Sequence, residues 1–290
     1  MESILSPFVQ AIRERWPHVR SEVSDDPVFI MAAGWRSGST LLQRMLLQRC
    51  LVWGEPYEPH ALFGLMAEQL RYLSKVWPPN EFFIDDPSWG SHLTYKWTAN
   101  LYPPVADLAD AHAAYFKRLF EEPARRRGFP RWGIKLVRHG MDHAAYLHWL
   151  FPKARFLFLI RNPYDCWSSY RRGRARVAKF FSEPPIDSPE QFAEHWLALA
   201  GGFWNRHSEV GGQLLRFESL VSADFDPHGV NQYLGFNLHL GARAEKIGAA
   251  PPGPYSLDEL ARLHEVVGGL ATRMGYASPV ASHGIGQVRG

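Results

Sequence analysis

Short, continuous apolar runs alternate along the chain with longer stretches in which apolar residues recur at helical spacing. The apolar runs, which are typical of strands buried in a parallel sheet, lie at 28–31, 51–53, 132–137, 155–160 and 214–217. Helical spacing occurs over 4–16, 41–49, 62–76, 107–122 and 142–150, again from Pro163, and over 190–207, 227–234 and 256–273. Strands that alternate with helices predict an α/β fold, a three-layer αβα arrangement around a central, mostly parallel sheet.

Two parts of the chain do not follow this alternation. Residues 77–104 are rich in proline, tryptophan, tyrosine and aspartate, which indicates an insertion or lid that binds the substrate. The tail 277–290 is rich in glycine, and we expect it to be loosely held. The chain has 290 residues, 46% of them hydrophobic, and no internal repeat, so we expect a single domain over 1–290.

Composition limits the classes of partner and the compartment. The net charge of +3 does not suggest a general nucleic-acid binder. The two cysteines, Cys50 and Cys166, both fall in predicted helical segments, where we expect them to be buried, and they form neither a disulfide framework nor a metal-binding spacing. The first 20 residues lack the features of a secretion signal, and no apolar run is long enough to span a bilayer. We therefore expect a cytoplasmic protein without a transmembrane segment.

The stretch 27–48 joins an apolar strand, a loop of small residues and the start of a helix. The first N–H groups of a helix lack partners inside it, and the helix dipole adds positive charge there, so such a loop can hold a phosphate. Gly34 and Gly38 permit turns that a Cβ would hinder. The loop also carries a cation and three hydroxyl groups, on Arg36, Ser37, Ser39 and Thr40. We expect this loop, P-loop-like in its context, to bind an anion, although a plain helix-capping loop has a similar composition.

The loop differs from that of nucleoside-triphosphate enzymes, in which a glycine is followed by four residues and then Gly-Lys-Ser/Thr. Here three residues separate Gly34 from Gly38, and Ser39 stands where the lysine would be. A kinase would therefore lack its main cation for the outer phosphates, and no clear Mg²⁺ carboxylate follows a strand. A P-loop small-molecule kinase and a non-catalytic nucleotide-binding module are kept as alternatives.

Polar residues follow two further strands. Glu55 and Glu58 come after the run 51–53, and Arg161 comes directly after 155–160, with Ser169 eight residues further on in the next helix. Because right-handed crossovers bring the carboxyl ends of parallel strands to one edge, we expect these groups to meet the loop at Arg36. A guanidinium and a hydroxyl suit a second phosphate. Two anion sites on one edge fit a ligand that is phosphorylated at both ends.

Two of these motifs resemble those of a known family. Arg36-Ser37-Gly38-Ser39-Thr40-Leu41-Leu42 resembles the 5′-phosphosulfate loop of sulfotransferases, and Arg161-Asn162-Pro163-Tyr164-Asp165, with Ser169-Tyr170, resembles their 3′-phosphate motif. Their order and strand–helix contexts agree, and the segment 150–156 is also similar. The resemblance implies 3′-phosphoadenosine 5′-phosphosulfate (PAPS) as donor, adenosine 3′,5′-bisphosphate as product, and transfer of a sulfuryl group to an acceptor oxygen or nitrogen.

The resemblance also implies roles for single residues. The segment Gly54-Glu55-Pro56-Tyr57-Glu58 is similar to a stretch of bacterial glycolipid and sugar sulfotransferases whose second glutamate is the base, which favours Glu58; a related Golgi motif would favour Glu55. Lys135 resembles a lysine that the protein-tyrosine and sugar branches place near the transferred group. Arg216 begins a segment similar to Arg-Tyr-Glu-x-Leu, with Phe217 in place of the tyrosine. A histidine base at His60, His139 or His143 is the minority interpretation, because the chain departs from the cytosolic branch in its loop.

The mechanism that the resemblance implies is in-line attack by the acceptor, with a glutamate taking its proton. Arg36 and Lys135 would stabilise the charge on the leaving oxygen, so we expect no metal. The aromatic-rich composition suits a small molecule, a sugar or a lipid-linked acceptor. The basic residues Arg171, Arg172, Arg174, Arg176 and Lys179 form either a solvated helix face or a contact with donor or acceptor. A homodimer is left open.

Overall fold

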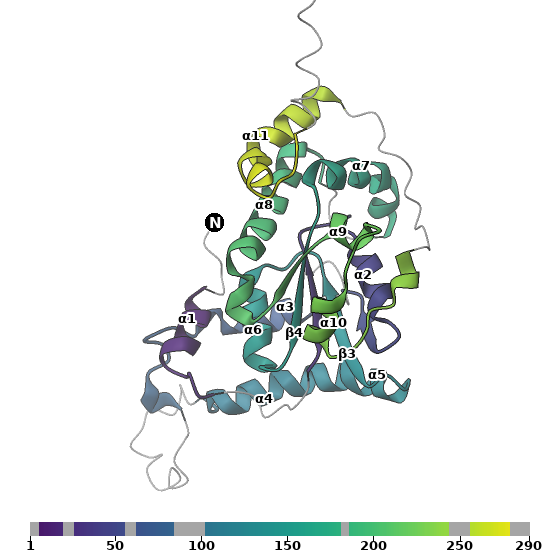
Figure 1. Ribbon diagram of the computed structural model, residues 1–290. Coiled ribbons are helices and arrows are strands. Elements are labelled where there is room, and N and C mark those ends of the chain that lie inside the picture. The colour runs from purple at the N-terminus through teal and green to yellow at the C-terminus, as the bar shows by residue number, and fades with distance from the viewer. Residues whose placement is uncertain are drawn as a thin grey trace, which may run out of the picture.

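The five apolar runs form one sheet in which every pair of neighbouring strands is parallel (Figure 1). The computed structural model of the protein describes residues 6–19, 26–55, 62–83, 102–180, 186–243 and 256–278. The strands are β1 (Val28–Ala32), β2 (Cys50–Trp53), β3 (Arg131–Leu136), β4 (Arg155–Ile160) and β5 (Gln213–Arg216), in the order β2-β3-β1-β4-β5. The predicted parallel sheet is confirmed.

Helices follow the strands in the alternating pattern that was predicted. They are α1 (Ser6–Glu14), α2 (Ser39–Leu46), α3 (Leu62–Gln69), α4 (Val105–Phe116), α5 (Glu122–Arg126), α6 (Met141–Leu150), α7 (Pro163–Phe180), α8 (Pro189–Arg206), α9 (Phe217–Val221), α10 (His228–Leu234) and α11 (Leu257–Arg273). A π-helical turn, Lys117–Glu121, joins α4 to α5. Serine side chains cap the starts of two long helices: Ser188 accepts the N–H of Gln191 in α8, and Ser256 accepts that of Glu259 in α11.

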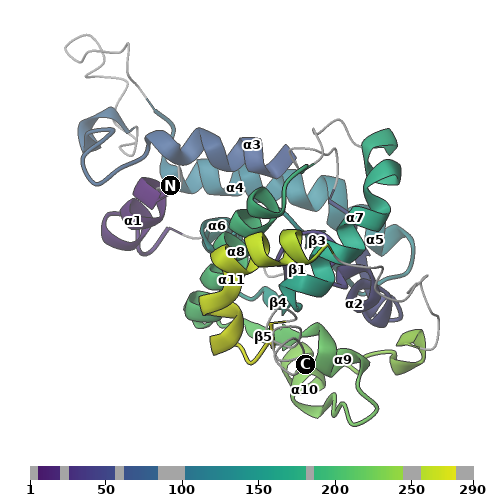
Figure 2. The same ribbon diagram turned by 90° about the horizontal axis from the view of Figure 1, so that it is seen from above.

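Successive side chains of each strand enter two separate cores. In β1, Phe29 and Met31 pack into one core, and Val28 and Ile30 pack into the other, as the two-residue period of a strand requires. Residues of α4, α6, α8 and α11 line the first core, whereas α2, α9 and α10 contribute to the second. Figure 2 shows α9 and α10 on one side of the sheet and α3, α4 and α6 on the other. The three-layer αβα arrangement is thus confirmed.

Strand order brings the loop after β1 next to the end of β4. Strand β1 lies in the middle of the sheet, between β3 and β4. The N–H of Ala33, just beyond β1, donates to the carbonyl oxygen of Leu159 in β4, at 2.9 Å. The segments that carry Arg36 and Arg161 therefore leave the sheet from neighbouring strands, although 125 positions separate these two residues in the sequence.

The expected place of Cys50 is wrong. We expected it in the helix after the loop, but it is the first residue of β2 and pairs with Arg131 of β3. The reason is that α2 ends at Leu46, so the chain has turned and entered the sheet by residue 50. The second cysteine, Cys166, lies in α7 as expected, and both thiols are buried.

Two other element boundaries differ from the prediction. The helix expected over 62–76 ends as an α-helix at Gln69 and continues only as a 3₁₀ turn, Leu70–Tyr72. It does not reach residue 76, because the Ser74 hydroxyl accepts the N–H groups of Val76 and Trp77 in a turn that replaces helical bonds. Phe217, expected to finish the last strand, begins α9 instead. Strand β5 stops at Arg216, which pairs with the last residue of β4, so no strand is available to continue the pairing.

The described ends of the predicted insertion lie away from the loop after β1. Residues 84–101 fall outside the described part of the chain. Phe83 and Tyr102, on either side of them, form an isolated bridge, and the Phe83 ring contacts Trp16 just beyond α1, with the ring centroids 5.9 Å apart. Figures 1 and 2 both show this region beside α1 and the start of α4. The role of 77–104 as a substrate lid stays a prediction.

Candidate functional site

The loop between β1 and α2 has an unusual backbone. Gly34, Arg36 and Gly38 all have positive φ angles, of 82°, 63° and 92°. This conformation costs a glycine little but costs a residue with a Cβ about 1–2 kcal/mol, so Arg36 is held there by its surroundings. The Ser37 hydroxyl is fully buried and donates to the carbonyl oxygen of Gly34, at 2.9 Å. Ser37 thus braces the loop from inside, while α2 begins directly after Gly38.

The structure brings together the two arginines that the sequence placed in separate anion sites. Arg161 donates from its guanidinium to the main-chain carbonyl oxygen of Arg36, at 2.9 Å. The Nε of Arg36 donates to the hydroxyl oxygen of Ser169 in α7, at 2.8 Å. The first loop and the second motif are therefore parts of one continuous site at the carboxyl edge of β1 and β4.

Arg36 and Arg161 carry positive charges that no carboxylate neutralises in the part of the chain that the structure describes. Within the described residues, neither Arg36 nor Arg161 forms an ion pair with a carboxylate, and the Nε of Arg161 is buried without a hydrogen-bond partner. Partial burial lowers the pKa of Arg36, and the charges of Arg161 and Arg172 lower it further. Cations that repel one another in this way favour an anionic ligand, which would remove the repulsion.

Lys135 approaches the same loop from β3. It projects to the face of the sheet that α2 covers, and its Nζ lies 3.5 Å from the hydroxyl oxygen of Thr40 in the first turn of α2. Ser39, the first residue of α2, is buried, whereas Thr40 is exposed. The predicted neighbourhood of Lys135, the loop hydroxyls and the start of the helix is therefore present.

Glu55 is enclosed by groups that follow β3. Its carboxylate forms an ion pair with Arg138, and its Oε1 lies 2.9 Å from the Nδ1 of His139. Only 1% of the Glu55 side chain is exposed, compared with 10% for Arg138 and 9% for His139. His143 packs edge-on against His139, and burial, together with the proximity of His139, lowers the pKa of His143 to about 3. His143 is therefore neutral at physiological pH.

Trp35, within the loop after β1, contacts a member of this buried pair. Its ring stacks on His195 of α8 at a centroid distance of 4.6 Å, and the guanidinium of Arg138 lies 5.2 Å from its centre. Burial lowers the pKa of His195 to about 4, with Arg138 adding to the shift and a hydrogen bond to the backbone of Val137 opposing it. A neutral histidine and a cation thus hold the ring of Trp35, the residue before Arg36.

Phe217 fills the space behind the loop. The guanidinium of Arg161 lies 4.3 Å from the centre of the Phe217 ring. A Cβ added to Gly38 would lie 2.1 Å from a carbon of the same ring, far closer than packing allows. The aromatic ring therefore supports both the loop and the second arginine, which does not require the hydroxyl of the tyrosine that the resemblance implied.

Arg216 lies at the same edge but faces other partners. Its guanidinium lies 4.5 Å from the centre of the Tyr276 ring, beyond the end of α11. The Tyr276 hydroxyl donates to Glu218, which also accepts the N–H of Asn162 at 2.8 Å. These contacts tie the C-terminal helix to the turn after β4. No described contact joins Arg216 to Arg36 or Arg161, so its place among the ligand-binding residues stays a prediction.

Several predicted residues fall outside the described structure. Glu58 and His60 lie in the stretch 56–61, and the side chains of Arg174, Arg176 and Lys179 are likewise not described. Residues 279–290, most of the predicted loose tail, belong to the same group. In the part of the chain that is described, no helix is long and apolar enough to cross a membrane.

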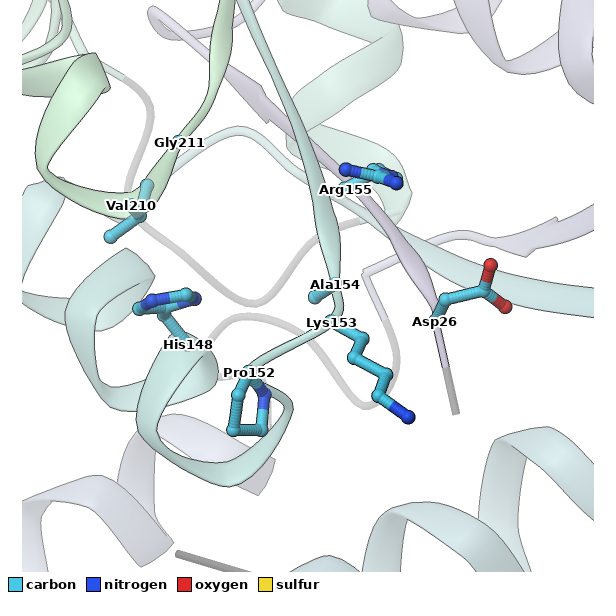
Figure 3. Close-up of a pocket in the computed structure, with 8 residues that line it drawn as sticks. All are labelled: Asp26, His148, Pro152, Lys153, Ala154, Arg155, Val210 and Gly211. Carbon is cyan, nitrogen blue, oxygen red and sulfur yellow. The ribbon is translucent and has the colours of Figure 1, made fainter. Parts of the chain in front are cut away.

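A surface pocket of about 720 Å³ lies at the opposite edge of the sheet (Figure 3). It is lined by Lys153 and Arg155 on the stretch that enters β4 and by Asp26 just before β1, together with His148 of α6. Ligands of open parallel sheets bind at the carboxyl ends of the strands, whereas this pocket lies at their amino ends. We therefore assign the functional site to the arginine cluster.

The sequence did not predict the role of Trp35 in the site, nor the two residues that contact its ring, Arg138 and His195. Arg138 had a usable signal, since it follows a buried strand as Arg161 does. His195 had none, because it lies in the middle of α8 and approaches Trp35 only through the packing of α8 in the tertiary structure.

The fold and the site together define a class: an α/β protein with a parallel sheet whose carboxyl edge carries a loop, a helix start and two arginines suited to an anionic ligand. The family model described as "Sulfotransferase family" matches residues 27–226, which contain the loop, both arginines and all five strands. The protein belongs to the sulfotransferase family. No curated protein matches the chain in sequence.

Similar solved structures are bacterial sulfotransferases and a biosynthetic sulfotransferase domain. Sulfotransferase STF9 from Mycobacterium avium is 15% identical, with 94% of this chain and 84% of that chain covered and a TM-score of 0.45. A sulfotransferase from Alicyclobacillus acidocaldarius is 16% identical, with coverage of 88% and 98% and a TM-score of 0.42. The sulfotransferase domain from the curacin biosynthetic pathway is 18% identical, with coverage of 88% and 99% and a TM-score of 0.42.

Proposed function

We propose that this sulfotransferase transfers a sulfuryl group from PAPS to a hydroxyl or amine of a small-molecule, sugar or lipid-linked acceptor. The observation that carries the proposal is the contact between Arg36 and Arg161, whose charges are not neutralised by a carboxylate within the described residues. A donor with a phosphosulfate at one end and a phosphate at the other supplies two anionic groups for two cations that come from adjacent strands.

The residues present fit such a donor. Arg36, with the loop from Ser37 to Thr40 and the N–H groups at the start of α2, would hold the 5′-phosphosulfate. Arg161 and Ser169 would hold the 3′-phosphate, and the buried, unpartnered Nε of Arg161 has a hydrogen to donate. Arg216 is proposed as a further contact on the strength of the resemblance alone.

Two cations and a carboxylate would act on the reaction itself. Lys135 reaches Thr40 in the first turn of α2, and Arg36 lies in the loop that leads into this helix with its Nε on Ser169; both cations would stabilise the negative charge that develops on the leaving oxygen. A carboxylate would accept the proton of the attacking acceptor. We favour Glu58 for this role over Glu55, since the carboxylate of Glu55 is enclosed by Arg138 and His139 and only 1% of its side chain is exposed.

Calorimetric titration with adenosine 3′,5′-bisphosphate tests the donor site directly. We expect binding to the wild-type protein, and we expect Arg36→Met and Arg161→Met each to weaken it about tenfold or more, the loss typical of a charge-assisted contact. Arg155→Met is the matched control, because Arg155 begins β4 at the opposite edge and stacks on Tyr233. Binding of ATP with Mg²⁺ in place of the bisphosphate would indicate a kinase and refute the proposal.

Transfer of labelled sulfate from PAPS to a panel of phenols, sugars and glycolipids tests the reaction. Glu58→Gln should abolish turnover and leave the affinity for the bisphosphate within about twofold, because the base acts only on the acceptor proton. If Glu58→Gln retains turnover and Glu55→Gln loses it at unchanged bisphosphate affinity, the base is Glu55.

A further inference from the structure

A chain of contacts connects Glu55 to the phosphate loop. The carboxylate of Glu55, after β2, pairs with Arg138, after β3. The guanidinium of Arg138 lies 5.2 Å from the centre of the Trp35 ring, after β1. Since β2, β3 and β1 are neighbours in the sheet, these contacts run along its carboxyl edge from one strand to the next and end beside Arg36.

The buried position of the ion pair needs an explanation other than stability. Removing two charges from water costs about as much as their attraction returns, so an apolar pair would stabilise the fold equally well. An ion pair does, however, fix the direction of a planar guanidinium more narrowly than apolar packing does. Here the fixed guanidinium of Arg138 faces an aromatic ring, and a cation over such a ring adds to its stabilisation.

The residue that follows Trp35 has the most strained backbone of the loop. Arg36 adopts a left-handed conformation at φ 63° although it carries a side chain. Such a conformation persists only where its neighbours hold it. Trp35 on one side is held by Arg138 and by His195, and the carbonyl of Arg36 is held by Arg161.

We propose that Glu55 is a positioning residue, which through Arg138 fixes Trp35 and so presents the Arg36 guanidinium to the 5′ end of the donor. This rests on the proposed function, and it assigns to Glu55 a role distinct from that of the base. Glu55 does not touch the donor in this arrangement, and its effect passes through Arg138. Arg138 becomes a part of the donor site that the sequence motifs do not include.

The test compares two ligands that share the adenosine and the 3′-phosphate. Adenosine 3′,5′-bisphosphate has a 5′-phosphate for the Arg36 loop, and adenosine 3′-monophosphate lacks it. We expect Glu55→Gln and Arg138→Met each to weaken binding of the bisphosphate about tenfold, and to change binding of the monophosphate less than about twofold. The double variant should lose no more than either single variant, because both act on the same ring.

Trp35→Leu should also weaken binding of the bisphosphate and not of the monophosphate, although it removes no charge. If a single variant does not fold, the double variant Glu55→Gln/Arg138→Met replaces it in the titrations, since it leaves neither member of the ion pair charged. Glu121→Gln is the matched control: its carboxylate is also buried and accepts from Arg125 at 2.6 Å, on the π-helical turn that joins α4 to α5. It should leave the affinity for both ligands unchanged.

Three results would overturn the proposal. Unchanged bisphosphate affinity in Glu55→Gln with turnover lost would make Glu55 a catalytic base. Equal losses for both ligands would indicate general loosening of the site. Additive losses in the double variant would show that Glu55 and Arg138 act separately. If the wild-type protein does not bind the bisphosphate at all, the proposed function is itself wrong, and this outcome is distinct from the other three.

Discussion

Substituting alanine for Gly38 should damage the fold and the donor site together, for two separable reasons. Gly38 has a φ of 92°, a conformation that costs alanine about 1–2 kcal/mol. The added Cβ would also lie 2.1 Å from the Phe217 ring, which must move, and overpacking of this kind costs about 1–3 kcal/mol. We therefore expect Gly38→Ala to lower the free energy of unfolding by about 2–5 kcal/mol.

A matched control separates the two causes. Gly128 has a φ of 81°, but a Cβ added there would meet nothing within 4 Å. Gly128→Ala should therefore show the backbone cost alone, about 1–2 kcal/mol. Adding Phe217→Ala to Gly38→Ala should relieve the clash and leave the backbone cost, which gives a coupling energy of about 1–3 kcal/mol in a double-mutant cycle.

Urea unfolding of the four variants gives these free energies, and bisphosphate titration gives their consequence for the site. Because the Phe217 ring also lies 4.3 Å from the guanidinium of Arg161, a ring displaced by alanine should weaken ligand binding as well as stability. The reasoning is refuted if Gly38→Ala costs no more than Gly128→Ala, or if its effect adds to that of Phe217→Ala without coupling.

Three further predictions follow from the loop and the buried groups. Burial lowers the pKa of His195 from 6.5 to about 4 in the folded protein, so the unfolded chain takes up the proton first and the free energy of unfolding falls as the pH drops from 6.5 to 4. The free energy of unfolding should fall by about 2 kcal/mol between pH 7 and pH 4.5. The same pH dependence of stability in His195→Gln would contradict this prediction. The free energy of unfolding of Arg36→Gly should exceed that of Arg36→Ala by about 1–2 kcal/mol, because glycine adopts the left-handed backbone without strain. Both variants should lose bisphosphate affinity. Equal stability of the two variants would exclude backbone strain at this position. Burial raises the pKa of Cys50 and Cys166 to about 12, so a thiol reagent should label neither at pH 8 until the protein is unfolded.

The sheet was the most predictable part of the fold. Five apolar runs gave five strands, because a strand buried on both faces admits few polar residues and its length is short. Helix ends were less predictable. The segment after α3 leaves the helix at the Ser74 hydroxyl, whose bonds to the N–H groups of Val76 and Trp77 replace helical bonds; the spacing of apolar residues does not show this competition.

The site was predictable where a motif joined a cation to a strand end. Arg36, Arg161 and Ser169 were expected on one edge, and in the structure Arg36 hydrogen-bonds to both of the others: its Nε donates to Ser169, and its carbonyl oxygen accepts from Arg161. The supports of these residues were not predictable. Phe217 was noted only as a tyrosine that had lost its hydroxyl, whereas in the structure its ring determines how closely Gly38 and Arg161 approach. Such a role depends on tertiary packing, which no local spacing encodes.

The strain in the loop and the repulsion between the arginines at the site have a common consequence for affinity. Repulsion between Arg36 and Arg161 and the left-handed backbone of Arg36 both raise the free energy of the ligand-free protein. An anion removes the repulsion but not the strain, which the surrounding contacts must support whether or not a ligand is bound. The buried Glu55–Arg138 pair and the Trp35 stack therefore have to be stable without ligand. A site assembled in this way does not pay for ordering the loop at each binding event, which is how preorganisation raises affinity.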